Sequence, residues 1–229
     1  PGGPPEQPYD IAGWTLALQM GVRRVAVSQP FQCVSKMMDV ITPQEVVIGG
    51  KGENYVVRAG SNDDFRLQNR LHKAGVPFKI LGGAGQGNAN TTDSHATDFS
   101  DGQGAPVASG SLFIPGGGKA GRELPKLLEG LSCEVVRAGE PGGKSASALI
   151  DATPGRIALY QSWTANADEG WTRLVLEQHE FDFATLHDAG IRAGELRKRY
   201  DCIILPSQGV DGMVNGNAPD STEPQYTGG

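Results

Sequence analysis

The stretch that decides the fold runs from Arg156 to Gln208 and reads RIALYQSWTANADEGWTRLVLEQHEFDFATLHDAGIRAGELRKRYDCIILPSQ. Short apolar runs in it predict strands, and the longer periodic segments between them predict helices. These predicted elements are strands at 156–160, 183–186 and 202–205 and helices at 168–179 and 192–200. Strands that alternate with helices of about ten residues need crossover connections, which produce mainly parallel sheets with flanking helices. The sequence therefore predicts the α/β class.

The residues before this stretch show similar but weaker signals, and they set the expected domain boundaries. We expect a strand at 24–28, a hairpin at 45–57, a helix from Ser61 to a Gly75 cap, strands at 76–81, 111–115 and 132–137, and a helix at 122–129. Residues 82–110 have no apolar periodicity and predict a long, mobile surface loop. The predicted organisation is a proline-rich extended docking arm at 1–22, a small α/β domain at 23–138, a linker at 139–154 and a partial α/β domain at 155–229.

Composition and charge exclude several classes of protein. The chain has 229 residues with Lys+Arg 20 and Asp+Glu 26, a formal net charge of -6, which argues against binding to a nucleic-acid backbone. No apolar run approaches the ~20 residues that a bilayer span needs. The 33 glycines and 15 prolines predict that an unusually large share of the chain is loop. The last predicted strand ends at Pro206, and because only Gly-, Asn- and Pro-rich sequence follows it, we expect a truncated domain.

The densest group of candidate binding residues lies between the first strand and first helix of the deciding stretch. This is the edge at which open α/β sheets bind ligands. The candidate ligand-binding residues are Gln161, Ser162, Trp163, Asn166, Asp168 and Trp171. In the binding interpretation the polar side chains contact a ligand and the two tryptophans form walls. In the alternative, Asp168 caps the helix and the tryptophans are core or interface anchors.

One pattern resembles a phosphate-binding loop. Residues 138–145 read AGEPGGKS, which makes Lys144 and Ser145 candidate phosphate-binding residues. A working loop must open a helix whose N-terminal amides hold the phosphates, and a second strand must supply an acidic residue for magnesium. Pro154 follows too soon for a long helix, so a linker is the favoured interpretation and nucleotide binding the weaker alternative.

No catalytic constellation or metal site is predicted from the remaining residues. A nucleophile elbow of the form GxSxG or GxCxG is absent, and the four histidines form no HxxE, HExxH or HxH pattern. The three cysteines form no CxxC pair, which argues against a disulfide framework or zinc knuckle. Cys202, inside DCIILP, is expected to be a small buried residue of a strand. We therefore assign no catalytic residue and no cofactor to this chain.

The deciding stretch resembles a region found C-terminal to the catalytic domain in large bacterial zinc carboxypeptidase-like metallopeptidases. Residues 8–22, PYDIAGWTLALQMGV, are similar to the segment that leads into that region. The resemblance implies that the later part of the chain is a class I glutamine-amidotransferase-like domain with a flavodoxin-like fold. The zinc-binding residues of the family and the nucleophile elbow of amidotransferases have no counterparts here. Zinc is therefore expected only in the catalytic domain of the parent protein.

The leading functional hypothesis is a non-catalytic accessory and interaction region of a secreted or periplasmic zinc carboxypeptidase-like protein. Its expected partner is its own catalytic domain or a second copy, and neither a nucleic acid nor a membrane span is expected. One alternative is a small-ligand or nucleotide-binding α/β module. Another is part of an amidotransferase-like enzyme that residues beyond this chain complete, so whether the parent region is enzymatic stays open.

Overall fold

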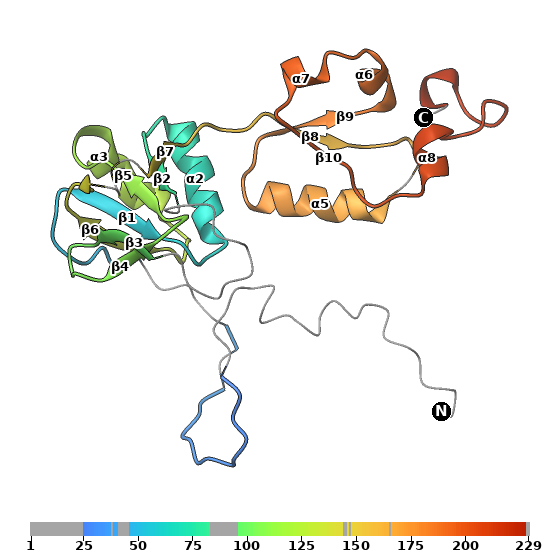
Figure 1. Cartoon of the computed structure of the whole chain (residues 1–229). Helices are drawn as coiled ribbons and strands as arrows, with labels where there is room; N and C mark the ends of the chain where they lie inside the picture. The colour runs from blue at the N-terminus through green and yellow to red at the C-terminus, as the bar shows by residue number, and fades with distance from the viewer. Residues whose placement is uncertain are drawn as a thin grey trace.

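The computed structural model describes residues 25–37, 39–40, 46–82, 96–143, 146, 148–164 and 166–227. The arm expected at 1–22 lies outside these residues, and so do Lys144 and Ser145. The described chain has mixed α/β content and forms two units (Figure 1). The first unit comprises residues 46–151 and the second unit residues 156–227.

The first unit is built on a five-stranded sheet. Its strands are β1 (Asn54–Arg58), β2 (Lys79–Leu81), β5 (Leu112–Ile114), β6 (Glu134–Ala138) and β7 (Leu149–Asp151), in the order β6-β1-β5-β2-β7. Every pairing in this sheet is antiparallel, so the expectation of a mainly parallel sheet is wrong for this unit. β7 lies within the range expected to be a linker. No hairpin forms at 45–57, because β1 pairs with β5 and β6 instead.

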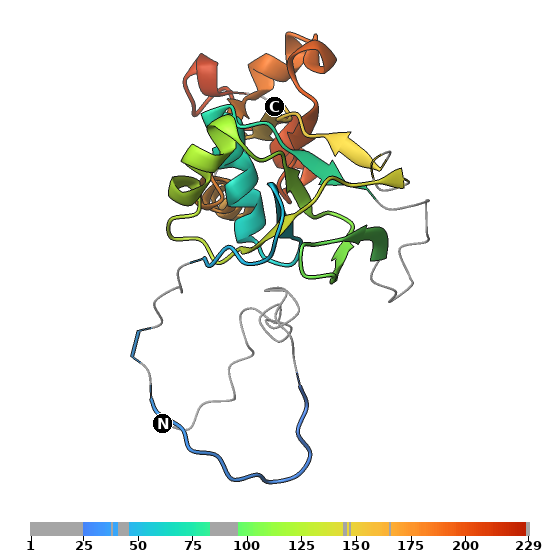
Figure 2. The same ribbon diagram turned by 90° about the vertical axis from the view of Figure 1, so that its left-hand side faces the viewer.

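Two helices cover one face of this sheet, as Figure 2 shows. They are α2 (Asp63–Ala74) and α3 (Gly118–Leu127). Leu67 and Leu71 of α2 and Leu124 of α3 have no exposed surface and pack against the buried side chains of β1 and β5. α2 ends as predicted at Gly75, whose φ of 61° is a left-handed cap conformation that glycine adopts without strain. The main core therefore lies between the helices and this sheet.

A small hairpin covers the opposite face of the sheet, where a long loop was predicted. β3 (Ala96–Ser100) and β4 (Pro106–Ala108) pair with each other, and Phe99 and Val107 pack on Phe113 of β5. Asp101, expected to be a solvated acid, is only 6 % exposed and forms an ion pair with Arg58 of β1. The loop expectation is wrong for residues 96–108, because contacts distant in sequence order this polar segment.

The second unit has the parallel sheet that the deciding stretch predicts. β8 (Ile157–Tyr160) lies between β9 (Phe183–Leu186) and β10 (Cys202–Ile204), and both pairings are parallel. α5 (Ala167–Gln178) packs on one face of the sheet, and α6 (Asp188–Arg192) and α7 (Leu196–Arg199) lie on the other (Figure 1). α8 (Val210–Val214) and a 3-10 turn (Pro224–Tyr226) follow β10. Cys202, expected to be buried, is exposed because β10 is an edge strand among the described residues.

Two predicted elements differ from the structure. The helix expected at 192–200 is interrupted, because Gly194 and Glu195 have φ angles of 74° and 57°, which a continuous helix cannot contain. Within the expected range, α6 ends at Arg192 and the short helix α7 begins at Leu196. The strand expected at 24–28 is absent from its described part, where residues 25–28 are exposed and have no strand pairing.

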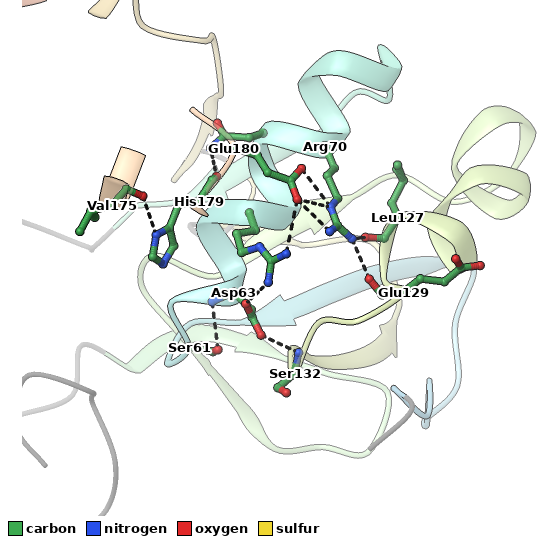
Figure 3. Close-up of polar contacts among 11 residues, drawn as sticks. Ser61, Asp63, Arg70, Leu127, Glu129, Ser132, Val175, His179 and Glu180 are labelled. Atoms are coloured by element: carbon green, nitrogen blue, oxygen red, sulfur yellow. Dashed lines mark hydrogen bonds and ion pairs between the residues drawn. The ribbon is translucent and has the colours of Figure 1, made fainter. Parts of the chain in front are cut away.

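A polar clamp joins the two units, as Figure 3 shows. Glu180, in the turn after α5, accepts hydrogen bonds from Arg70 of α2, with an Nη2 to Oε1 distance of 2.8 Å. Arg70 also donates to the carbonyl oxygens of Leu127 and Glu129, at 2.9 and 2.8 Å. The amide of Asn69 donates to the carbonyl oxygen of His179 at 2.8 Å. We call the contacts of Arg70 with Glu180 and of Asn69 with His179 the interunit clamp, because they hold α2 against the second unit; the bonds to Leu127 and Glu129 lie within the first unit and orient Arg70.

Candidate functional site

The candidate site lies at the carboxyl ends of β8 and β10. The first strand of this sheet in the chain, β8, lies in the middle, with the second strand, β9, on one side and the third strand, β10, on the other. The connections that leave β8 and β9 therefore depart toward opposite edges, and a crevice opens where the direction changes. Ligands of open α/β sheets bind at such a switch point. Residues 161–166 and 205–208 form the two loops at this position.

Side chains from the two loops hold each other in place. The amide nitrogen of Gln208 donates to the hydroxyl oxygen of Ser162 at 2.8 Å, and that hydroxyl donates to the carbonyl oxygen of Thr164 at 2.8 Å. The amide nitrogen of Asn166 donates to the carbonyl oxygen of Ser207 at 3.2 Å. The loop after β8 is thus fixed to the loop after β10, with Ser162 buried beneath both.

Asn166, and not Asp168, caps the helix that starts at the site. Its side-chain oxygen accepts a hydrogen bond from the backbone N–H of Asp168 at 2.9 Å, and its own backbone is extended, as an N-cap requires. The interpretation of Asp168 as the cap is therefore wrong. Asp168 is exposed in the first turn, where its charge favours the positive end of the helix dipole.

Trp163 acts as an anchor for the end of the chain. Its ring stacks on His187 with centroids 4.0 Å apart and planes 12° apart, and Tyr226 meets it edge-on at 4.8 Å. Its carbonyl oxygen accepts a hydrogen bond from the amide of Asn217 at 3.4 Å. His187 is held by Gln161, whose carbonyl oxygen lies 2.7 Å from Nδ1. Trp163 thus holds the C-terminal segment and also lines the crevice, so it has features of both interpretations.

The crevice holds a cavity of about 260 Å³. It is lined by Gln161, Ser162, Trp163, Thr164, Asn166 and Glu169. Four of the six predicted ligand-binding residues thus come together there, whereas Asp168 and Trp171 are not part of the lining. Trp171 is 67 % exposed on the outer side of α5.

The sequence reasoning missed Thr164, Glu169 and Gln208. Glu169 is only 7 % exposed, and its Oε1 atom accepts a hydrogen bond from Nε of Arg173, one turn later, at 3.0 Å. This i, i+4 pair of opposite charges is the signal that could have pointed to Glu169. Gln208 had no comparable signal, since its contact with Ser162 spans 46 residues of sequence.

The electrostatics of the cavity favour uncharged or donor-rich molecules. Among the described residues that line the cavity, Glu169 alone is charged, and the guanidinium of Arg173 is engaged by its carboxylate and by the hydroxyl of Thr185 at 3.1 Å. The hydroxyl oxygen of Thr164 is buried and has no hydrogen-bond partner among the described residues. The described part of the lining therefore offers hydroxyl and amide groups and a carboxylate, but no cation for a phosphate.

Tyr160, at the end of β8, supports the site from below. Its hydroxyl donates to Oδ1 of Asp188 at 2.5 Å, and both side chains are buried. Burial, together with the hydrogen bond to Asp188, raises the pKa of the Tyr160 phenol. The phenol stays protonated at neutral pH, so its role is to satisfy Asp188 and not to accept a proton.

The described residues around Lys144 and Ser145 give little support to the phosphate-loop hypothesis. Lys144 and Ser145 lie outside the described residues, and β7 already begins at Leu149 and belongs to the antiparallel sheet of the first unit. Too few residues separate Ser145 from this strand for the helix that a phosphate loop must open. The hypothesis therefore stays a prediction without a structural context.

In the part of the chain that the structure describes, no three His, Cys, Asp or Glu side chains lie close enough together to hold a metal ion. Nor does any helix in the described ranges have the length and apolar character needed to cross a bilayer.

Comparison with known proteins found no matching family model, no matching curated protein and no matching solved structure.

Proposed function

We propose that this chain is a non-catalytic accessory and interaction region of a secreted or periplasmic zinc carboxypeptidase-like metallopeptidase. The sequence resemblance of residues 156–208 and 8–22 motivates the proposal. The strand order β9-β8-β10 agrees with the first three strands of the flavodoxin order and supports a class I glutamine-amidotransferase-like domain. The zinc ion of such a protein would belong to its catalytic domain.

The observation that carries the proposal is the uncovered edge of the second unit. In the described chain β10 pairs only with β8, so its outer edge offers unpaired backbone groups. Leu205, Val210 and Val214 follow β10 beyond its carboxyl end (Figure 1) and are 60, 75 and 63 % exposed. An unpaired strand edge and large exposed apolar side chains are both features of surfaces that partners cover. A partner that binds at β10 and at the segment after it would cover both.

Binding to the catalytic domain of the parent polypeptide tests the proposal. We expect the purified chain to bind that domain, or a second copy of itself, in sedimentation velocity and biolayer interferometry. Leu205→Arg and Val210→Arg should weaken the complex at least about tenfold, since a buried apolar contact becomes a buried charge. Val47→Arg is the matched control, because Val47 is 84 % exposed but lies in the first unit.

Two results would contradict the proposal. The first is a chain that binds neither the catalytic domain nor itself at concentrations up to about 100 μM. The second is hydrolysis of a peptide or an amide by the purified chain alone, which would show that it carries its own catalytic site.

The cavity at the switch point favours a second candidate function, the binding of a small polar ligand. The lining supports uncharged amides and hydroxyl compounds over nucleotides, because its described residues include a carboxylate and no cation. Calorimetry tests this with acetylated amino-acid amides on one side and AMP and ATP on the other. We expect heat only with the amides, and its loss in Gln161→Ala. Heat with neither class, or an equal response in Gln161→Ala, would remove this candidate.

A further inference from the structure

Helix α5 presents apolar side chains on two opposite sides. One side carries the buried apolar Leu176, together with the buried carboxylate of Glu169. The other side carries Trp171, Leu174 and Val175, which are 67, 39 and 53 % exposed. At about 100° per residue the two sets lie roughly half a turn apart. We call Trp171, Leu174 and Val175 the outer stripe.

The outer stripe has the composition of a docking surface. In Figure 1, α6 and α7 lie on the other face of the sheet, and no described element covers the outer side of α5. Tryptophan beside leucine and valine at i, i+3 and i+4 spacing is typical of a helix face that packs against a second element. Asp168 and Glu177 are exposed at the two ends of the stripe. A matching partner therefore has an apolar centre and basic groups at its margin.

A second copy of the chain does not meet this requirement. In an antiparallel pair of α5 helices, Asp168 of one copy would approach Glu177 of the other, and like charges at such a contact oppose association. Arg173 cannot compensate, because its guanidinium is bonded to Glu169 on the sheet side of the helix. The acidic margin thus argues for a different occupant.

The chain itself contains a segment with the required pattern. Residues 8–24 read PYDIAGWTLALQMGVRR, in which Ile11, Trp14, Leu18 and Val22 recur at helical spacing and two arginines follow. The segment lies outside the described residues. Its apolar positions match the outer stripe in character, and it carries a net positive charge, because Arg23 and Arg24 outweigh Asp10 at the other end. This charge is opposite to that of the acidic margin of α5.

The connection between this segment and the first unit is long enough for contact. Val46 and Ile48 pack against the main core of the first unit, and roughly 20 residues separate them from Arg24. Such a length spans up to about 70 Å when extended. Because the segment is tethered to the first unit, its effective concentration at α5 is in the millimolar range, and even a weak contact gives a substantial population of the docked state.

From these observations we propose that residues 8–24 dock on the outer stripe of α5. The apolar side chains of the segment cover Trp171, Leu174 and Val175, and its two adjacent arginines lie toward the acidic residue at one end of the stripe. The docked segment covers a surface that would otherwise be free to bind a partner. This contact is independent of the uncovered β10 edge, on which the proposed function depends.

The fluorescence of Trp171 in the full chain tests the proposal. The chain contains three tryptophans, so the double substitution Trp14→Phe and Trp163→Phe leaves Trp171 as the sole tryptophan. Phenylalanine at position 163 keeps an aromatic ring against His187 and Tyr226. We expect acrylamide to quench Trp171 at least about threefold less than N-acetyltryptophanamide. Leu18→Asp in this background should restore quenching. Met20→Asp is the matched control, because residue 20 lies on the side of a helix opposite to residue 18, and it should leave Trp171 shielded.

A charge exchange provides a second readout. Asp168→Lys with Glu177→Lys should expose Trp171, and adding Arg23→Glu with Arg24→Glu should shield it again. Far-UV circular dichroism confirms that each variant is folded.

Three outcomes would overturn the proposal. They are quenching of Trp171 in the sole-tryptophan chain at the rate of the free indole, shielding that survives Leu18→Asp, and shielding that disappears on dilution together with a dimer mass. The last outcome would assign the outer stripe to a second copy. None of these measurements contains the catalytic domain, so they do not depend on the binding test of the proposed function.

Discussion

Glu180 is the residue at which the two units can be separated most selectively. Its carboxylate accepts hydrogen bonds from Nε and Nη2 of Arg70 at 2.8 to 3.1 Å, and Arg66 approaches it at 3.5 Å. Glu180→Ala removes all of these contacts and leaves the bonds from Arg70 to the carbonyl oxygens of Leu127 and Glu129 intact. Glu180 has a φ of 60°, and since alanine meets similar strain there, the substitution reports mainly on the carboxylate.

The size of the effect follows from the burial of the pair. The side chains of Arg70 and Glu180 are 20 and 30 % exposed, so solvent screens the ion pair in part. A bidentate, charge-assisted contact in this setting is worth about 1 kcal/mol, between the values for exposed and buried pairs. Arg70→Ala should cost about 2 to 3 kcal/mol, because it also leaves two carbonyl oxygens without their donor. The coupling energy in the double-mutant cycle should be about 1 kcal/mol.

Urea unfolding followed by two probes measures this coupling. Trp163 and Trp171 lie in the second unit, so with Trp14→Phe as background, fluorescence follows that unit, whereas far-UV circular dichroism follows both. In Glu180→Ala the fluorescence midpoint should fall by about 0.3 to 1 M urea, given typical slopes of 1 to 3 kcal/mol per M. The dichroism curve should become biphasic as the units uncouple. Glu180→Gln, which keeps the shape of the side chain, should show an intermediate effect.

The clamp explanation would be refuted by coincident, unshifted transitions in Glu180→Ala. It would also be refuted by a coupling energy below about 0.3 kcal/mol, since independent sites add within that margin.

Three further predictions concern titration and buried polar groups. The hydrogen bond from Arg70 holds the pKa of Glu180 below its ordinary value of 4.5, so the stabilising contribution of Glu180 is complete above that pH and is lost as pH falls through the folded-state pKa. The free energy of unfolding should therefore decrease less on acidification in Glu180→Gln than in the unmodified chain. An equal dependence of this free energy on pH in the two proteins would contradict the assignment. Burial raises the pKa of the Cys133 thiol, so Ellman's reagent should label two exposed thiols rapidly in native protein and the third only in urea, whereas three fast thiols would contradict the packing. Tyr160→Phe leaves buried Asp188 without its donor and should destabilise the second unit by about 1 to 3 kcal/mol in urea; a change below about 0.5 kcal/mol would contradict this role.

The second unit shows how far local patterns carry a prediction. Its three strands and α5 lie within one or two residues of the predicted ranges, because each is defined by apolar residues within one short segment. Parallel pairing follows from the crossover connections alone. The exception is the segment 192–200, where Gly194 and Glu195 adopt left-handed backbone conformations that the helical pattern did not reveal.

The first unit could not be predicted to the same degree, because its order depends on distant contacts. β1 pairs with β5 and β6, which follow it by more than 50 residues, and nothing in the local sequence of β1 specifies these partners. The hairpin at 96–108 is similar, since Arg58 reaches Asp101 across 43 residues. At the candidate site, Gln208 could not be predicted for the same reason, because its contact with Ser162 is distant in sequence. Asn166 could be predicted as a site residue, because it lies in the segment that follows β8.

The distribution of apolar surface explains why the two units have different roles in our proposals. The first unit buries long side chains from two helices and a five-stranded sheet, and it covers both sheet faces itself. Among the described residues of the second unit, the buried apolar ones are Ala158, Leu159, Tyr160, Leu176 and Leu186. A core of this size supplies little of the free energy that ordering the unit requires. We therefore expect the second unit to gain stability from outside itself, through the interunit clamp and through the two contacts that we propose, of residues 8–24 with α5 and of a partner with β10. Because the clamp, the outer stripe and β10 are different surfaces, removing one contact should weaken the unit without exposing the other two sites.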